Sequence, residues 1–228
     1  MSVAVLIPCY NEETTIYDVV SKFKKALPEA EIYVYDNCST DNTADEARRA
    51  GAIVKYEKKR GKGNVVKSMF KDIDTDIYIT VDGDMTYNID DAPKMIKLIE
   101  DKHLDMVVAA RKKASAKSYP ACHEFGNKIY NIIMKILFGG NFTDIFSGFR
   151  AFSKDFVKSF KVSAEGFDIE AEMTIYSLVT NKRCAEIASE YYSRPAGSHS
   201  KLSTIKDGFK VLLKILILFK NYKLQQLI

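Results

Sequence analysis

Short apolar runs, rich in β-branched and aromatic residues, alternate with stretches of helical periodicity over the first 110 residues of the chain. The runs that we expect to form strands are residues 3–7, 31–35, 52–56, 77–81 and 106–110. Strands that alternate with helices are typical of a parallel sheet with crossover helices. This half of the chain therefore predicts an α/β fold.

Helices are expected in the intervals between these strands. After the first strand, apolar residues recur at helical spacing until Pro28 ends the pattern. Ser39-Thr40 is a candidate cap for a second, polar helix, which Gly51 terminates. A third helix follows residues 61–63, and a fourth begins near Pro93.

Beyond residue 110 the alternation becomes irregular. A polar loop at residues 111–121 precedes an amphipathic helix, and a short strand, a helix and a strand follow at residues 149–152, 168–180 and 184–190. A basic helix is expected at residues 204–223. We predict a mixed, mostly parallel sheet flanked by helices in a main domain, residues 1–203, followed by an amphipathic segment, residues 204–228.

The charge of the chain is small and unevenly distributed. With 46% hydrophobic residues, the 228-residue chain can bury a substantial core, and its net charge is +4. Residues 194–228 carry +6, which leaves −2 for all preceding residues. A net charge of this size does not indicate a nucleic-acid-binding protein, so no nucleic-acid partner is expected.

Cysteine spacing and the apolar runs bear on the cellular compartment. The four cysteines are dispersed and include no Cys-x-x-Cys pair, which favours reduced thiols in a cytoplasmic protein over a zinc ribbon. The first apolar run, residues 3–7, is too short for a signal peptide. The most apolar stretch, residues 211–219, is shorter than the about 20 residues of a membrane span.

Polar residues follow the predicted strands, at the edge where open α/β sheets bind ligands. The sharpest cluster is Asp82-Gly83-Asp84, in which a small residue lets two carboxylates approach one cation. Carboxylate oxygens suit Mg²⁺ or Mn²⁺ that bridges to a diphosphate. The alternative is an ordinary Asp-Gly turn.

Two further motifs have competing interpretations. Asp36 could accept a hydrogen bond from a nucleobase or form an Asx turn. Gly61-Lys62-Gly63 could contact phosphate, or form a glycine turn with a solvated lysine. Neither a Gly-x-Gly-x-x-Gly after the first strand nor a Gly-x-Ser-x-Gly is present, which disfavours a dinucleotide-binding dehydrogenase and a serine hydrolase.

Six motifs follow one another along the chain: Ile7-Pro8-Cys9-Tyr10-Asn11-Glu12-Glu13, Asp36-Asn37-Cys38-Ser39-Thr40-Asp41, Gly61-Lys62-Gly63, Asp82-Gly83-Asp84, Ser147-Gly148-Phe149-Arg150 and Arg194-Pro195-x-Gly197-Ser198-x-Ser200-Lys201-Leu202. In this order they resemble family 2 glycosyltransferases with the GT-A fold, most closely the dolichyl and polyprenyl phosphate sugar synthases. The resemblance spans residues 3–222.

The resemblance implies a donor site for a nucleotide sugar and a metal-dependent transfer. The nucleotide-sugar-binding residues implied are Pro8, Tyr10, Glu12, Asp36, Lys62, Asp82, Gly83, Asp84, Arg194 and Lys201. Asp84 would bind Mg²⁺ or Mn²⁺, and Thr86 stands where relatives carry a glutamine ligand. Among nucleotides, a UDP-sugar is slightly favoured over GDP-mannose.

Cations near the acceptor phosphate are also implied by the resemblance. Arg111 and Arg194 match such positions, whereas the following loop offers Lys117 where relatives often carry another arginine. Asp144 and Glu172 fall at matching acidic positions. With Asp84 and Arg111, Asp144 completes the catalytic set that we expect.

The acceptor class decides whether a base is needed. A polyprenyl phosphate is already anionic and can attack the anomeric carbon directly, with inversion. A sugar hydroxyl would need a general base, for which Asp144 is the candidate. Two alternatives to the polyprenyl phosphate sugar synthase therefore remain open: a transferase that acts on a sugar hydroxyl, and a non-catalytic nucleotide-sugar-binding subunit.

The basic C-terminal helix predicts contact with a membrane surface. One apolar face carries Leu202, Ile205, Phe209, Leu212, Leu213, Leu216 and Phe219, and a lysine row carries Lys206, Lys210 and Lys214. Such helices lie in membrane interfaces, which places the protein at the cytoplasmic face of a membrane. The alternative is a helix packed on the protein's own core. A homo-oligomer is left open.

Overall fold

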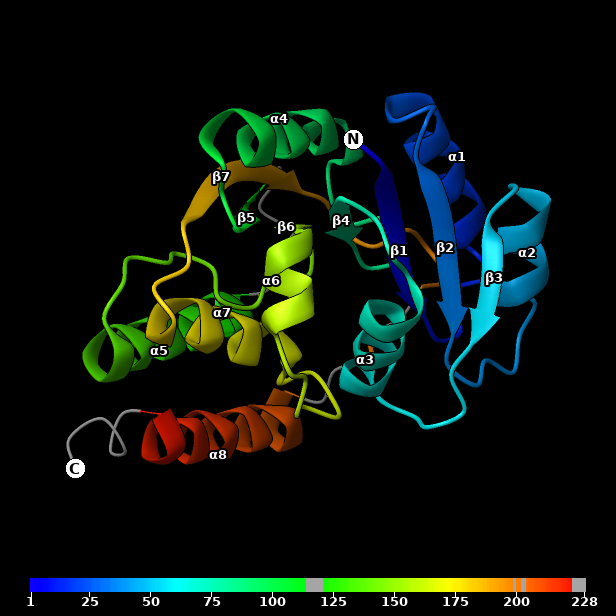
Figure 1. Cartoon of the computed structure of the whole chain (residues 1–228). Coiled ribbons are helices and arrows are strands. Elements are labelled where there is room, and N and C mark those ends of the chain that lie inside the picture. Colours follow the sequence, from blue (N-terminus) through cyan, green and yellow to red (C-terminus); the bar gives the residue numbers. More distant parts are fainter. Residues whose placement is uncertain (114–120, 199, 202–203, 223–228) are drawn as a thin grey trace.

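The computed structural model describes residues 1–113, 121–198, 200–201 and 204–222. A sheet with helices on both faces occupies most of the molecule (Figure 1). The strands are β1 (Val3–Cys9), β2 (Glu31–Asp36), β3 (Ile53–Tyr56), β4 (Ile77–Thr80), β5 (Met106–Lys113), β6 (Arg150–Ser153) and β7 (Cys184–Tyr191). The helices are α1 (Ile16–Ala26), α2 (Thr43–Arg49), α3 (Lys62–Asp72), the 3₁₀ turn η1 (Ile89–Asp91), α4 (Ala92–Lys102), α5 (Ala121–Phe138), α6 (Lys154–Ser159), α7 (Ile169–Val179) and α8 (Thr204–Tyr222).

The sheet is mixed and mostly parallel, as predicted. Its strand order is β3-β2-β1-β4-β6-β5-β7. All neighbouring strands pair in parallel except β6, which runs antiparallel to both β4 and β5. The carboxyl ends of β1, β2, β4 and β5 therefore share one edge of the sheet.

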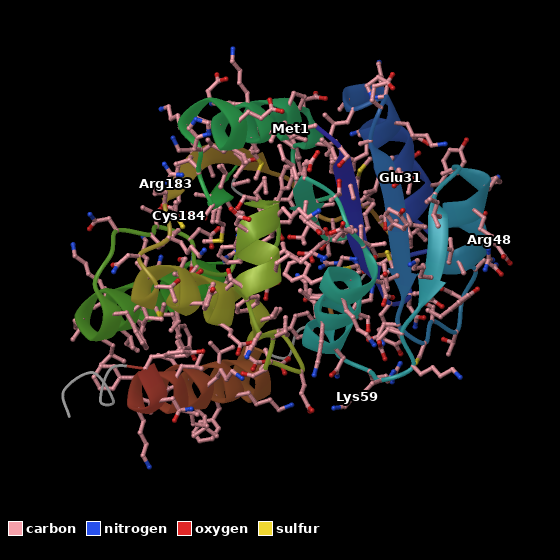
Figure 2. All side chains as sticks on the ribbon, viewed as in Figure 1. Met1, Glu31, Arg48, Lys59, Arg183 and Cys184 are labelled. Atoms are coloured by element: carbon pink, nitrogen blue, oxygen red, sulfur yellow. The ribbon has the colours of Figure 1, made fainter. Side chains whose placement is uncertain are left out.

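Successive side chains of the strands point alternately into two hydrophobic cores, one on each face of the sheet. In β1, Val5 and Ile7 pack beneath α1 and α4, whereas Ala4 and Leu6 face α3, α6 and α7. Side chains from both faces fill the space between the layers (Figure 2). Because successive side chains point to opposite faces, a strand that is buried on both faces is apolar at almost every position, as β1 is.

A third cluster joins α5, α7 and α8 at the end of the molecule where α8 lies beyond α7 (Figure 1). Val211, Ile215 and Leu218 of α8 are buried in it. The rings of Phe138 and Phe219 meet at 5.7 Å. One face of α8 thus packs on the core, and no helix in the described ranges is long and apolar enough to cross a membrane.

Several predicted boundaries need correction. The second helix begins at Thr43, because Asp41 accepts hydrogen bonds from the backbone and hydroxyl of Thr43, while Ser39 and Thr40 bond to Asn11 instead. Strand β5 continues to residue 113, so Arg111 lies within the strand and not after it. Helix α6 and the turn η1 were not predicted. Both are short, and short elements carry little periodicity.

Candidate active site

A pocket of about 670 Å³ lies at the carboxyl edge of the sheet. The predicted residues that line it are Pro8, Tyr10, Glu12, Lys62, Asp82, Gly83, Asp84, Thr86, Arg111, Arg194 and Lys201. Asp36 and Asp144 are buried and are not among the lining residues, and Lys117 lies outside the described residues. The pocket therefore brings together residues from the whole length of the chain.

The turn after β4 depends on close packing around Gly83. A Cβ at this position would lie 2.7 Å from Sγ of Cys9. The carbonyl of Gly83 accepts a hydrogen bond from the hydroxyl of Thr15 at 2.7 Å. A side chain at position 83 would require Cys9 to move, and the two flanking carboxylates, Asp82 and Asp84, both line the pocket.

Asp84 is buried and held on both sides. Its Oδ1 accepts hydrogen bonds from the hydroxyl and the N–H of Thr86, at 2.5 and 3.2 Å. Its Oδ2 lies 2.5 Å from the guanidinium of Arg194. Burial, and then the nearby charge of Asp82, raise the pKa of Asp84 above its ordinary value. In this geometry Thr86 orients Asp84.

A second acid, Glu12, anchors the segment that follows β7. Its Oε1 lies 2.6 Å from Nζ of Lys201 and 3.7 Å from Arg194, and its Oε2 accepts from the hydroxyl of Ser198. Burial raises the pKa of Glu12. Arg194 and Lys201 therefore line the pocket as ion-pair partners of its acids, Asp84 and Glu12.

Lys62 is buried between two carboxylates. Its Nζ forms ion pairs with Asp82 and, at 2.6 Å, with Glu170 of α7. Burial alone would lower the pKa of Lys62, but the two carboxylates raise it above its ordinary value. Of the two interpretations of this motif, the solvated lysine is therefore wrong, since Lys62 links the pocket wall to α7.

The glycine turn before α3 serves packing. The N–H groups of Gly63 and Asn64 donate to the carbonyls of Gly166 and Glu165, at 3.1 and 3.4 Å. A Cβ at Gly63 would lie 2.3 Å from the carbonyl oxygen of residue 164. These N–H groups are thus not available to a phosphate, and the turn lets α3 approach residues 164–166 closely. Direct contact of Lys62 with the donor stays a prediction.

The two acids of α7 have different surroundings. Glu170 lines the pocket beside Lys62, and burial raises its pKa. Glu172 is not among the lining residues and accepts hydrogen bonds from the backbone N–H groups of Ser163 and Ala164. The sequence pointed to Glu172 and missed Glu170, because its partner Lys62 is distant in the chain.

Arg111 and Asp144 form a bidentate pair. Nε of Arg111 lies 2.6 Å from Oδ2 of Asp144, and NH2 lies 2.7 Å from Oδ1. The backbone N–H groups of Arg111 and Phe146 and the amide of Asn127 also donate to Asp144. Burial alone would raise the pKa of Asp144, but Arg111 and these hydrogen bonds lower it.

Arg150 stabilises the loop that carries Asp144 through hydrogen bonds. This fully buried side chain donates to the carbonyls of Ile145 and Ser147 and to the hydroxyl of Thr174. A Cβ at Gly148, which precedes β6, would lie 2.6 Å from Oδ2 of Asp82. The Ser-Gly-Phe-Arg motif thus fixes the loop and leaves room for Asp82.

The end of the pocket near β2 is lined by an aromatic ring, a guanidinium and a side-chain amide. The guanidinium of Arg60 lies over the ring of Tyr10 at 4.2 Å from its centroid. The carbonyls of residues 57 and 59 accept from the amide of Asn37, whose oxygen accepts from the N–H of Gly61. Asp36 accepts from the N–H of Ser39, three residues on, which is one residue further than in an Asx turn. Arg60 and Asn37 line the pocket and were not predicted as site residues.

The acids of the pocket fit a metal that takes most of its ligands from substrate and water. Among the described residues there is no group of three or more His, Cys, Asp or Glu side chains that could hold a metal ion alone. Asp82 and Asp84 supply carboxylate oxygens in the pocket wall. Mg²⁺ and Mn²⁺ prefer such oxygens and are commonly completed by phosphates and waters.

Comparison with known proteins gives consistent matches. A family model described as glycosyl transferase family 2 matches residues 4–160. Glycosyltransferase AglJ of Haloferax volcanii is 33% identical over 223 residues, which cover 94% of this chain and 71% of AglJ. Undecaprenyl-phosphate mannosyltransferase of Micrococcus luteus is 24% identical over 217 residues, which cover 89% of this chain and 88% of that protein.

Solved structures support the predicted fold. Glucosyl-3-phosphoglycerate synthase from Mycobacterium tuberculosis, in complex with Mn²⁺, UDP and phosphoglyceric acid, matches with a TM-score of 0.75 at 19% identity. The match covers 96% of this chain and 78% of that one. The GT-A fold expected from the sequence is confirmed.

Proposed function

The chain belongs to glycosyl transferase family 2, and we propose that it transfers a sugar from a nucleotide-sugar donor to a polyprenyl phosphate with inversion of the anomeric carbon. The observation that carries the choice of acceptor is the Arg111–Asp144 pair. It offers a cation to a phosphate, and it holds the candidate base as an ion-paired carboxylate.

A general base works best when its pKa lies near the working pH. The pKa of Asp144 is lowered, and its two oxygens already accept several N–H groups. Asp144 is therefore poorly suited to remove a proton from a sugar hydroxyl. A phosphate acceptor needs no such step, because it is anionic before it reacts. In the proposed reaction, Asp144 fixes the plane of the Arg111 guanidinium.

The donor would span the pocket from β2 toward β4. Tyr10, under Arg60, offers a ring face to the base, and Arg194 and Lys201 offer charges to the diphosphate. We propose a uridine nucleotide in preference to a guanosine nucleotide, and the mycobacterial synthase, which shares this fold, was solved with UDP.

A divalent cation is proposed at Asp84, beside Asp82. A bound Mg²⁺ or Mn²⁺ would neutralise charge on the departing nucleoside diphosphate. The chain's own contribution is to hold Asp84 with Thr86 and to place Arg194 next to it. Arg194 would then turn from Asp84 to the diphosphate and help to neutralise its charge.

The acceptor phosphate is proposed to bind at Arg111, with Arg194 and Lys117 as further cations. Arg111 lines the pocket, and Lys117 lies outside the described residues. The related mannosyltransferase named for undecaprenyl phosphate supports a lipid acceptor. With such an acceptor the protein would work at the cytoplasmic face of a membrane, and α8 would touch the lipid surface through its exposed Phe209, Leu213 and Leu216.

The test is turnover by the purified protein. It would be incubated with Mn²⁺, a panel of UDP- and GDP-sugars, and a short, water-soluble prenyl phosphate. We expect one donor to give a prenyl phosphate sugar whose anomeric configuration, read by NMR, is opposite to that of the donor. Transfer to a sugar hydroxyl alone, or retention of configuration, would overturn the proposal.

A further inference from the structure

The outer faces of α5 and α8 expose apolar side chains that the pocket does not use. On α5, Ile129, Ile132 and Ile136 are 41%, 58% and 76% exposed. On α8 the exposed residues are Phe209, Leu213, Leu216 and Ile217. These seven side chains define the α5–α8 surface. In the described part of the chain, the one other comparably exposed isoleucine, leucine or phenylalanine is Ile53 of β3.

The α5 row was not expected from the sequence, which indicated an ordinary amphipathic helix. Met134 and Phe138 already supply the buried face of α5. Ile129, Ile132 and Ile136 follow one another at intervals of three and four residues on the other side, so they form a second apolar row. A contiguous exposed apolar row indicates a binding surface.

Positive charge accompanies both rows. Lys128 and Lys135 are exposed on α5, as are Lys210 and Lys220 on α8. Among the described side chains of these two helices, the single acid is Asp207, which lines the pocket. Lys214 is directed inward, where it bonds to the hydroxyl of Ser163 at 2.7 Å and lies 3.6 Å from Glu172. The predicted outward lysine row is therefore corrected at this position.

We propose that the α5–α8 surface binds an anionic membrane, so that α5 is a second membrane-contact helix beside α8. The inference rests on the proposed function, in which the acceptor is a lipid. Apolar residues flanked by lysines match the apolar interior and anionic headgroups of a bilayer leaflet. A second copy of the chain would bring lysines against lysines, so charge complementarity favours the lipid.

The two helices also reach the active-site pocket. Tyr130 of α5 donates to the carbonyl of Gly208 in α8 at 2.8 Å, and its ring packs on Phe146 at 5.2 Å. All three residues line the same pocket as Arg111. A lipid phosphate held at this end of the molecule would therefore meet the proposed acceptor cation within one pocket.

The experiment is vesicle co-sedimentation of the full chain, with phosphatidylcholine vesicles that contain or lack phosphatidylglycerol. The wild type should bind the anionic vesicles and bind less in high salt. The double variant Ile132→Ser/Ile136→Ser should bind about tenfold more weakly, because apolar area is lost from the interface. Ile53→Ser, an equally conservative change at an exposed isoleucine on β3, should bind as the wild type does.

Wild-type binding by the α5 double variant, or no vesicle binding by the wild type, would overturn the inference. So would sedimentation velocity that shows a dimer dissolved by these substitutions without any vesicle binding. Turnover of a short, water-soluble prenyl phosphate in vesicle-free buffer should be equal in all variants. Turnover without vesicle binding would reject membrane binding by the α5–α8 surface and leave the proposed function intact. Absence of turnover in the wild type would reject the proposed function.

Discussion

The guanidinium of Arg194 lies 2.5 Å from Oδ2 of Asp84, so an arginine from the segment after β7 occupies one oxygen of this pocket carboxylate. Thr86 occupies the other oxygen with its hydroxyl and its N–H. A metal that binds Oδ2 must therefore displace Arg194. A nucleoside diphosphate would give the displaced guanidinium a new anionic partner, so metal and nucleotide should each strengthen the binding of the other.

Arg194→Gln tests this relationship. The variant should bind Mn²⁺ several-fold more tightly than the wild type when nucleotide is absent, because Asp84 is released, and it should bind UDP more weakly. Free Mn²⁺ would be measured by electron paramagnetic resonance. Lys201→Gln is the matched control, since Lys201 pairs with Glu12. Unchanged Mn²⁺ affinity in Arg194→Gln would show that the ion pair does not oppose metal binding.

Asp84→Ala should abolish transfer while the protein stays folded. The substitution removes the proposed metal ligand, and Arg194 keeps Glu12 as a neighbour at 3.7 Å. We expect kcat to fall at least about a hundredfold, as it does when an enzyme loses one group that stabilises charge in the transition state. Asp74→Ala, at an exposed carboxylate paired with surface lysines, serves as control. Undiminished activity in Asp84→Ala would reject the metal site.

Much of the site could be predicted because strand ends are visible in the sequence. Parallel strands place their carboxyl ends at one edge, so Glu12 and Asp82, which follow β1 and β4, could be grouped before their contacts were known. Arg111 was grouped with them on the premise that its strand ends at residue 110, although β5 continues to residue 113. Local chemistry also fixed the turn at Gly83. These inferences need neighbouring residues and the strand period alone, which a single sequence provides.

Contacts between distant segments could not be predicted in this way. Glu170 and Glu172 are two residues apart on α7, which directs them to different sides of the helix. The sequence does not state which of the two sides meets Lys62. The same limit applies to α5, where Ile132 and Met134 are equally apolar, yet one is exposed and the other buried.

Glu170→Gln and Glu172→Gln form a matched pair of variants. The pair distinguishes a residue that supports the donor site from a residue that only stabilises the fold. Glu170 is an ion-pair partner of Lys62, which also pairs with Asp82. Its variant should raise the KM for the donor by about tenfold, with a smaller change in kcat. Glu172 holds residues 163–164, so its variant should lower the melting temperature and leave KM unchanged. Equal KM values in the two variants would contradict the assignment.

The lowered pKa of Asp144 predicts how its contribution to stability depends on pH. In the unfolded chain an aspartate titrates near pH 3.9, and pairing with Arg111 puts the folded pKa below that. The stabilisation is therefore complete above about pH 4 and is lost as pH falls through the folded pKa. In urea unfolding, the difference in unfolding free energy between wild type and Asp144→Asn should be constant at neutral pH and shrink in acid. A difference that grows in acid would contradict the lowered pKa.

Asp144→Asn also separates the two acceptor classes. Asparagine keeps the size of the side chain and can still accept from Arg111, but it cannot act as a base. If Asp144 only orients Arg111, transfer to a prenyl phosphate should fall by less than about a hundredfold, and the pH profile of kcat should keep its shape. Loss of a required base would lower kcat at least about a hundredfold and would remove the acidic limb of that profile.

Arg111→Lys is the companion variant, since it keeps the charge but loses the bidentate geometry. It should impair the phosphate acceptor at least as much as Asp144→Asn does, because Arg111 is the group proposed to touch the phosphate.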